Sequence, residues 1–319
     1  MGEFELIDRF FKRPVTRSPL GIGDDCALLA PAAGMELAVS SDMLVEGRHF
    51  LSTVDPFKLG HKALAVNLSD LAACGARPLA FTLALAMPRA EEAWLEPFSR
   101  GLLALADEHA CELVGGDTTR GPLNICITVF GEVPQGQALL RSGARDGDDI
   151  YASGTLGEAR LALEAFRGTV SLPADVFEAA RARMEQPTPR VALGQALRGI
   201  ATAAVDVSDG LLGDLGHILR RSGVGARIDT AAAGRLMMPS CAAAVDEDRA
   251  LEYALAGGDD YELVFTAPAA SRDAVEAAAQ GAGTRVTRIG GIEAGSGLRL
   301  VDARGEPLQR RFGSFDHFA

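Results

Sequence analysis

The sequence predicts an α/β (α+β) protein with two domains, and three observations lead to this expectation. The chain has 319 residues, which exceeds a usual single core and is near two domains of about 150 residues each. Apolar runs typical of strands alternate with segments of helical periodicity. A composition of 48% hydrophobic and 23% charged residues is that of an ordinary globular protein.

Helical periodicity is clearest in four segments: Pro56–Cys74, Glu91–Ala110, Val191–Ile200 and Leu211–Arg221. The apolar stripe of the second segment is expected to pack in the core or in a dimer interface and comprises Trp94, Leu95, Phe98, Leu102 and Leu105. Strands are predicted in eight segments: Glu36–Ser40, Leu79–Ala86, Ile125–Glu132, Asp149–Ser153, Ala203–Val207, Gly225–Ile228, Tyr261–Thr266 and Arg285–Ile289. Pro and Gly punctuate the stretch Pro134-Gln135-Gly136-Gln137, so we expect domains at 1–137 and 138–319.

Charge and cysteine content exclude several classes of protein. The 31 Lys and Arg against 43 Asp and Glu give a net charge of −12, which opposes nucleic acid and anionic membranes as partners. No stretch approaches 18 uninterrupted apolar residues, and the start lacks the features of a signal peptide, so no membrane association is expected. The five cysteines contain no C-x-x-C pair, which predicts neither a disulfide framework nor a zinc site and fits the cytoplasm.

The usual nucleotide-binding and hydrolase motifs are absent from the sequence. The three lysines never occur as Gly-Lys-Ser/Thr, and Gly21-Ile22-Gly23-Asp24-Asp25-Cys26 lacks the last glycine of a dinucleotide-binding fingerprint. There is no Gly-x-Ser-x-Gly elbow and no His-Glu-x-x-His helix. P-loop, dinucleotide-binding, hydrolase and zincin functions are therefore disfavoured.

Aspartates recur at predicted strand or helix ends in short, mostly glycine- or serine-containing segments. These are Gly23-Asp24-Asp25, Ser40-Ser41-Asp42, Asn67-Leu68-Ser69-Asp70, Gly115-Gly116-Asp117-Thr118-Thr119, Asp206-Val207-Ser208-Asp209-Gly210 and Gly257-Gly258-Asp259-Asp260. Any one of them is readily explained as a turn or a helix N-cap. Together they favour Mg²⁺ and phosphate binding, because carboxylates are hard oxygen ligands and glycine lets backbone N–H groups approach phosphate oxygens. An acidic protein that binds nucleotides also needs cations between its carboxylates and the phosphates.

Histidine is scarce, and only His49 follows one of these segments, within Glu46-Gly47-Arg48-His49-Phe50. Its imidazole could donate a hydrogen bond to a phosphate or could cap a loop. Position alone leaves both roles open.

Five long motifs resemble the thiamine-monophosphate kinase family. They are Gly21-Ile22-Gly23-Asp24-Asp25-Cys26-Ala27, Asn67-Leu68-Ser69-Asp70-Leu71-Ala72-Ala73, Gly115-Gly116-Asp117-Thr118-Thr119-Arg120-Gly121, Asp206-Val207-Ser208-Asp209-Gly210-Leu211 and Gly257-Gly258-Asp259-Asp260-Tyr261-Glu262-Leu263. The likeness runs from Gly2 to Asp316-His317-Phe318, and the wider aminoimidazole ribonucleotide synthetase superfamily is resembled more weakly. The resemblance implies two mixed-sheet domains with flanking helices. It also implies a homodimer built through N-terminal sheets, an N-terminal ATP- and Mg²⁺-binding domain, and a C-terminal domain that completes the ATP and substrate sites.

The resemblance also implies roles for individual residues. Mg²⁺ ligands would be Asp25, Ser40, Ser41, Asp42, Asp70, Asp117, Asp206 and Asp209, of which Asp25, Asp42, Asp70, Asp117 and Asp209 would be the catalytic set. ATP would contact Gly116, Asp117, Arg141 and Ser208, and thiamine monophosphate would contact His49, Asp259 and Phe315. The family commonly has Glu in place of Asp259 and Tyr or Trp in place of Phe315, which could instead be a buried C-terminal anchor.

The reaction implied is transfer of the γ-phosphoryl group of ATP onto thiamine monophosphate, giving thiamine diphosphate. The acceptor oxygen is already anionic, so alignment and charge neutralisation suffice and no phospho-aspartate is expected. Two alternatives stay open: another superfamily synthetase, such as aminoimidazole ribonucleotide synthetase, and a silent module that only binds Mg-ATP. Turnover assays with the respective acceptors distinguish them.

Overall fold

The computed structural model describes residues 2–308 and 312. Its contacts divide the chain into two units. Unit 1 holds the chain up to Leu71 together with Ala76–Gly136, and unit 2 holds Ala72–Gly75 together with the chain from Gln137 onward. The division after Gly136 lies within the turn-rich stretch where the sequence predicts a domain boundary. The boundary between the units is not a single point in the sequence, because the short segment Ala72–Gly75 belongs to unit 2 although unit 1 residues precede and follow it.

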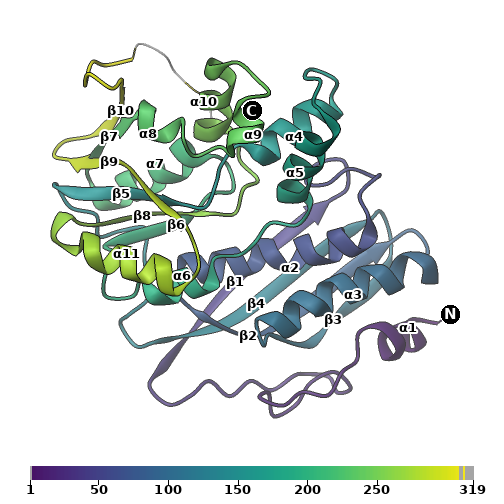
Figure 1. Ribbon diagram of the computed structural model, residues 1–319. Coiled ribbons are helices and arrows are strands. Elements are labelled where there is room, and N and C mark those ends of the chain that lie inside the picture. Colours follow the sequence, from purple (N-terminus) through teal and green to yellow (C-terminus); the bar gives the residue numbers. More distant parts are fainter. Residues whose placement is uncertain (1, 309–311, 313–319) are drawn as a thin grey trace. The chain divides into compact units, whose positions relative to one another are not determined.

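Unit 1 is a four-stranded sheet with helices (Figure 1). Its elements are α1 (Glu3–Phe10), β1 (Met35–Val45), α2 (Pro56–Ala73), β2 (Arg77–Met87), α3 (Glu92–Glu108), β3 (Glu112–Arg120) and β4 (Asn124–Pro134). The strand order is β1-β4-β2-β3; β4 is antiparallel to both of its neighbours, and β2 and β3 run parallel. The sheet is therefore mixed, with β1 and β3 at its edges.

Two helices of unit 1 cross at glycines. A Cβ on Gly60 of α2 would lie 2.0 Å from the Phe98 carbonyl oxygen, and one on Gly101 of α3 would lie 1.9 Å from that of Phe57. No side chain fits at either position, so the two backbones approach closely. Four residues of the predicted apolar stripe of α3, Leu95, Phe98, Leu102 and Leu105, are buried in the core, and Trp94 is half-buried.

A cluster of hydrogen bonds ties the N-terminal segment of unit 1 to β3. The Glu112 carboxylate accepts hydrogen bonds from the backbone N–H groups of Thr16 at 2.5 Å, Arg17 at 2.9 Å and Ser18 at 2.9 Å. Burial opposes ionisation of Glu112, but these hydrogen bonds outweigh it and lower its pKa to about 2. The anchored segment leads directly into the Gly23-Asp24-Asp25 loop.

Unit 2 contains a six-stranded sheet of order β10-β7-β9-β5-β8-β6. Its strands are β5 (Asp148–Ser153), β6 (Ala203–Asp206), β7 (Gly225–Asp229), β8 (Leu263–Pro268), β9 (Val286–Glu293) and β10 (Gly297–Val301). Its helices are α4 (Glu158–Phe166), α5 (Ala174–Glu185), α6 (Val191–Ala196), α7 (Leu211–Ser222), α8 (Thr230–Ala233), α9 (Pro239–Ala242), α10 (Glu247–Ala256) and α11 (Arg272–Gly281), with a 3₁₀ turn at Ala269–Ser271. Among the described strands of this sheet, β10 and β7 form the one parallel pair, so this sheet is mixed as well.

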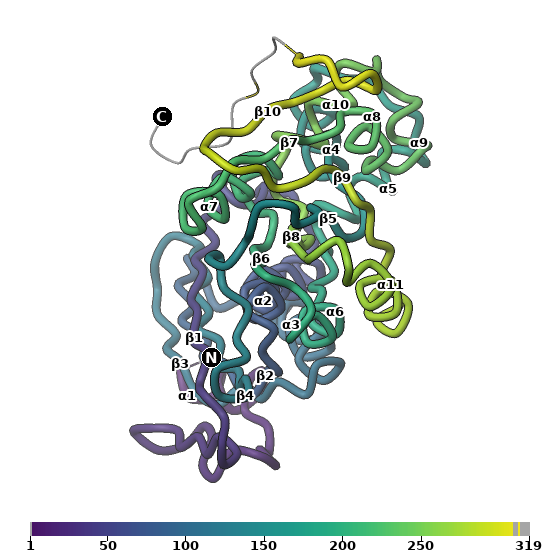
Figure 2. The backbone as a smooth tube through the Cα atoms, turned by 90° about the vertical axis from the view of Figure 1, so that its left-hand side faces the viewer, coloured from purple at the N-terminus to yellow at the C-terminus, as the bar shows by residue number. Residues whose placement is uncertain are grey.

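Helices cover both faces of the six-stranded sheet. Leu215 and Ile218 of α7 pack with Ile150 and Val264 of the sheet in one core cluster. The neighbouring strand positions project to the other face, which α11 and α6 cover side by side (Figure 2). Because both faces of the sheet are covered, the central strand β5 is buried along its whole length and β8 is buried from Leu263 to Ala267.

Most predicted elements are confirmed, and the differences have local causes. The four predicted helices correspond to α2, α3, α6 and α7, and the eight predicted strands correspond to β1, β2 and β4–β9. The sequence missed β3, β10, α1, α4, α5 and α8–α11. In β3, the Gly115-Gly116 pair suggests a loop, but pairing with β2 overrides that weak local propensity.

The structure also corrects the expected surroundings of two aspartates. Asp42 and Asp117 were expected in loops at strand ends, but β1 continues to Val45 and β3 continues to Arg120. Both aspartates therefore lie within strands, where ladder hydrogen bonds to β4 and β2 hold their backbones.

The five cysteines are all free. Among the described residues, no helix combines the length and apolar character needed to cross a bilayer.

Candidate active site

Three predicted metal ligands gather where β1 faces the last turns of α2. Ser40 Oγ donates a hydrogen bond of 2.5 Å to the Asp70 carboxylate, and the Asp42 N–H donates one of 3.0 Å to Asn67 Oδ1. Asn67 is itself fixed, because its Nδ2 donates to the Ala63 carbonyl at 3.0 Å. Asn67 and Asp70 are three residues apart and so share one face of the helix. The result is an oxygen-rich face of unit 1.

The side chain of Ser41 lies on the opposite face of β1. Its Oγ donates to the Ile127 carbonyl at 3.0 Å and lies 3.0 Å from Thr128 Oγ1, both on β4. Successive residues of a strand point to opposite faces, so Ser41 could join a site on the Ser40 and Asp42 face only through its main chain.

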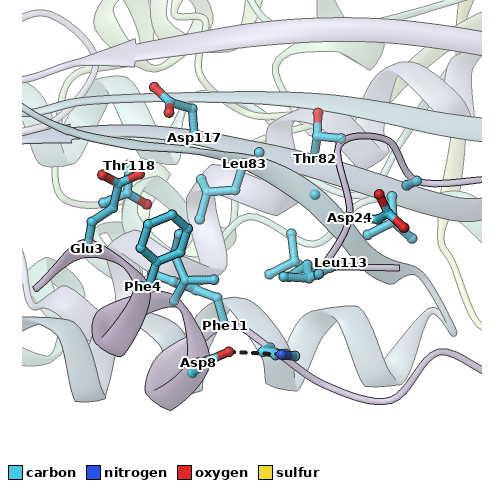
Figure 3. A pocket seen from close by; sticks show the side chains of 18 of the residues that line it. Glu3, Phe4, Asp8, Phe11, Asp24, Thr82, Leu83, Leu113, Asp117 and Thr118 are labelled. Carbon is cyan, nitrogen blue, oxygen red and sulfur yellow. Dashed lines mark ion pairs between the residues drawn. The ribbon is translucent and has the colours of Figure 1, made fainter. Parts of the chain in front are cut away.

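A cavity of about 720 Å³ in unit 1 lies between α1, the Gly23–Asp25 loop and β3. Asp24, Asp25, Gly116 and Asp117 line it. Figure 3 shows Asp24 and Asp117 apart along this cavity, with α1 residues including Glu3, Phe4 and Asp8 forming another part of its wall. The cation at its wall is Lys12, whose Nζ lies 3.0 Å from Asp8 Oδ1. The cavity is thus wide and predominantly acidic.

Gly116 has a conformational requirement independent of any ligand. Its φ is +146°, and a Cβ there would lie 1.8 Å from the Leu83 carbonyl oxygen on β2. Only glycine fits this close approach. The conformation presents Asp117, the next residue, at an exposed position of the edge strand.

His49 lies in the turn that follows β1. The ring Nδ1 of His49 accepts a hydrogen bond of 3.0 Å from the backbone N–H of Val45. The backbone N–H of His49 donates to the Val45 carbonyl at 3.0 Å. Because Nδ1 is an acceptor, the proton of the neutral ring lies on Nε2. The imidazole is therefore oriented to donate through Nε2.

A second group of predicted residues comes together in unit 2. The Asp214 carboxylate, at the start of α7, accepts hydrogen bonds from the N–H groups of Ser208 at 3.1 Å and Asp209 at 3.0 Å. Burial raises the pKa of Asp214 to about 6, while those backbone hydrogen bonds and the nearby Arg141 guanidinium act in the opposite direction. Arg141, Ser208 and Asp209 therefore share one neighbourhood.

Two more predicted residues adjoin this group. Asp206 ends β6 and is 5% exposed, and the Asp259 N–H donates a 2.7 Å hydrogen bond to the Ser208 carbonyl. The third predicted substrate contact, Phe315, lies outside the described residues.

The predicted ligands thus fall into three groups: Ser40, Asp42 and Asp70 on β1 and α2, Asp25 with Gly116 and Asp117 at the cavity of unit 1, and Asp206 with Ser208 and Asp209 in unit 2. Within the described residues, no three His, Cys, Asp or Glu side chains are grouped as for one metal ion. Mg²⁺ commonly uses one or two carboxylates with waters and substrate phosphates, so this donor set suits it.

Sequence reasoning overlooked two residues that orient the others. Asn67 holds the backbone of Asp42, and its place three residues before Asp70 on a predicted helix was the available signal. Asp214 holds Ser208 and Asp209, and an acid in the first turn of the following helix could have suggested this role.

Comparison with known proteins agrees with this architecture. Residues 23–133 match the family model described as AIR synthase related protein, N-terminal domain, and residues 145–303 match its C-terminal domain. The thiamine-monophosphate kinase of Salmonella typhimurium strain LT2 is 49% identical over 327 residues, which cover 100% of this chain and 98% of the relative. The chain belongs to the thiamine-monophosphate kinase family. It is accordingly a phosphotransferase.

Solved structures of the thiamine-monophosphate kinase family share the fold. The crystal structure from Stenotrophomonas maltophilia K279a has a TM-score of 0.85 and 48% identity, covering 96% of each chain. AaThiL complexed with AMPPCP and TMP has a TM-score of 0.74 and 29% identity, covering 91% of this chain and 89% of that chain. The predicted two-domain, mixed-sheet fold and the family resemblance are confirmed.

Proposed function

We propose that this chain transfers the γ-phosphoryl group of ATP in one direct step onto the phosphate of thiamine monophosphate, with Mg²⁺ held by its aspartates. The observation that carries the proposal is the full-length likeness to thiamine-monophosphate kinases. The AaThiL structure contains AMPPCP, which has the phosphate chain of ATP with a methylene bridge, together with TMP. ATP-dependent phosphorylation of thiamine monophosphate is the activity of the family.

The chemistry explains why a site built from aspartates and main-chain groups suffices. The acceptor is a phosphate oxygen that is already ionised, so no strong general base is needed. The chain must instead align two anionic substrates and relieve their repulsion. In unit 2, Ser208 and Arg141 are proposed to contact ATP, and Asp259 is proposed to face the cationic ring of the acceptor.

The metal ligands proposed are Asp25, Ser40, Ser41 through its main chain, Asp42, Asp70, Asp117, Asp206 and Asp209. Their fit to Mg²⁺ rests on an oxygen-only donor set and on the preformed pairing of Ser40 with Asp70. Bound Mg²⁺ would neutralise phosphate charge during transfer. In unit 1, Gly116 and Asp117 border the cavity and are proposed to take part in nucleotide binding, and His49 Nε2 is proposed to donate to the acceptor phosphate.

A turnover assay tests the proposal. With ATP and Mg²⁺, ADP release and chromatographic identification of the product are compared for thiamine monophosphate, free thiamine, a ribosyl amidine and no acceptor. Thiamine diphosphate is expected from the monophosphate alone, and acid quenching during turnover should trap no phosphoryl-enzyme.

Each other outcome redirects the proposal. ADP release that requires the ribosyl amidine would assign the chain to aminoimidazole ribonucleotide synthesis. Binding of Mg-ATP without turnover of any acceptor would leave a silent module, and a trapped phospho-aspartate would refute direct transfer. Removal of Mg²⁺ with EDTA should abolish product formation and its return should restore it.

A homodimer through the unit 1 sheet is also proposed, supported by exposed apolar residues on the edge strand β1. Leu37 is 43% exposed, Val39 56% and Met43 52%, and they alternate along one face of a strand whose outer edge has no partner strand among the described residues. Such edges and apolar stripes are usually covered.

The variant Val39→Glu is expected to shift the dimer to monomer, because a carboxylate cannot be buried unpaired in an apolar interface. Sedimentation velocity measures the mass. Leu140→Glu, at an exposed apolar residue of unit 2 (56% exposed), is the control and should leave the dimer intact. A wild-type chain that sediments as a monomer at micromolar concentration would contradict the homodimer.

A cytoplasmic location is proposed from the five free cysteines, which are typical of a reducing compartment. Fractionation of cells that produce the protein would test it, and recovery outside the cytosolic fraction would refute it.

A further inference from the structure

The loop that joins α10 to β8 in unit 2, Gly257–Glu262, has an unusual backbone. Gly258 has φ +73°, Asp259 has φ +63° and Tyr261 has φ +53°. The left-handed region is unfavourable for residues with a Cβ, and most of all for large ones such as tyrosine. Surrounding contacts must therefore hold this conformation.

Main-chain hydrogen bonds attach the loop to the segment that carries Ser208 and Asp209. The Asp259 N–H donates to the Ser208 carbonyl at 2.7 Å, and the Tyr261 N–H donates to the Val207 carbonyl at 2.9 Å. A Cβ on Gly258 would lie only 2.8 Å from the Ser208 carbonyl oxygen. The two loops lie backbone against backbone, so the position of Asp259 is defined relative to Ser208.

Asp260, between the two left-handed residues, anchors the loop on its other side. Its side chain is 2% exposed, and its carboxyl oxygens accept hydrogen bonds from the Gly157 N–H at 3.0 and 3.1 Å. Gly157 precedes α4 and is itself packed tightly, because a Cβ there would lie 2.8 Å from the Ala254 nitrogen of α10. The carboxyl group of Asp260 points inward to this rigid junction while its neighbour Asp259 is half-buried.

We propose that Asp260 is a positioning residue of the acceptor site: its contact with Gly157 holds the loop so that Asp259 stands in a left-handed conformation beside Ser208. The proposal rests on the proposed function, in which Asp259 contacts thiamine monophosphate and Ser208 contacts ATP. Asp260 itself touches neither substrate in this scheme. It sets where the acceptor ring is held relative to the nucleotide.

The test compares Asp260→Ala and Asp260→Asn in the full-length enzyme, with KM and kcat measured for each substrate. Small displacements of positioning groups can cost up to about a hundredfold in rate. We therefore expect Asp260→Ala to raise KM for thiamine monophosphate by about tenfold or more, with KM for ATP within about twofold of wild type. Asp260→Asn should recover most of the loss, because its amide oxygen can accept from Gly157 and burial already favours the uncharged acid by raising the pKa of Asp260.

Hydrogen exchange supplies a readout that does not depend on turnover. The amides of Asp259 and Tyr261, which are hydrogen-bonded to Ser208 and Val207, should exchange faster in Asp260→Ala and at the wild-type rate in Asp260→Asn. Asp246→Ala, at the exposed N-cap of α10, is the matched control and should change neither KM nor the exchange of these two amides.

Equal changes in KM for both substrates, or no change in either, would overturn the proposal. If Asp260→Ala does not fold, Asp260→Glu takes its place, since the longer side chain must displace either the loop or Gly157, and the same selective rise in KM is expected. If wild-type protein does not phosphorylate thiamine monophosphate, the proposed function fails. The anchoring role is refuted separately if the amides of Asp259 and Tyr261 exchange at the wild-type rate in Asp260→Ala.

Discussion

Replacement of Asp42 by asparagine is expected to lower kcat by about a hundredfold to a thousandfold, the range observed when one charge-stabilising group is removed from an active site. Asparagine has the shape of aspartate, and the backbone N–H of residue 42 would still donate to Asn67 Oδ1. The change therefore removes a negative charge from the face that also carries Ser40 and Asp70, and little else. Thermal unfolding should occur at the wild-type temperature, and raised Mg²⁺ should recover part of the activity.

The measurement is ADP release at saturating ATP and thiamine monophosphate over a series of Mg²⁺ concentrations. Asp107→Asn is the matched control, because Asp107 also lies in unit 1 but forms an exposed ion pair with Arg13 at 2.9 Å. That variant should keep wild-type kcat. Turnover of Asp42→Asn within about threefold of wild type would remove Asp42 from the proposed metal ligands, since loss of a ligand carboxylate costs far more.

Replacement of Glu262 by glutamine is expected to destabilise the protein by about 3–5 kcal/mol, as for other buried charge networks that lose one partner. The Glu262 side chain is 0% exposed. It accepts hydrogen bonds from Arg190 at 2.5 and 2.6 Å, Arg183 at 2.7 Å and Ser153 at 2.6 Å. Glutamine would leave two largely buried guanidinium groups without a counter-charge. Its NH₂ group, a hydrogen-bond donor, would face groups that are themselves donors.

Thermal unfolding of the full chain should show a fall of about 10 °C for Glu262→Gln. Glu293→Gln is the matched control, since Glu293 also contacts two arginines, Arg227 at 3.4 Å and Arg299 at 2.5 Å, but is 32% exposed. Solvent screens that group, so its loss should cost less than about 1 kcal/mol. A similar decrease for both variants would show that burial does not strengthen the Glu262 network.

Residues of the candidate site could be predicted where they belong to one local motif. Contacts between segments far apart in the sequence could not. Asp70 and Asn67 share a helix face through their spacing, but the bond between Ser40 and Asp70 spans 30 residues and depends on how β1 packs against α2. The role of Glu262 was not predicted, because its partners Arg183 and Arg190 lie 79 and 72 residues earlier in the chain. Nothing in the sequence around Glu262 indicates that these charges converge.

The sequence by itself determined the family, the α/β alternation, the two-part organisation and the aspartate-rich segments, because periodicity, turn residues and ordered motifs are local properties of the chain. The tertiary structure alone decided that Asp42 and Asp117 lie within strands, that Ser41 faces away from Ser40, and that Asp260 is buried against Gly157. These features follow from strand register and from packing between elements far apart in sequence. A shift of one residue in the register of β1 would exchange the faces of Ser40 and Ser41 without any change in the motif that contains them.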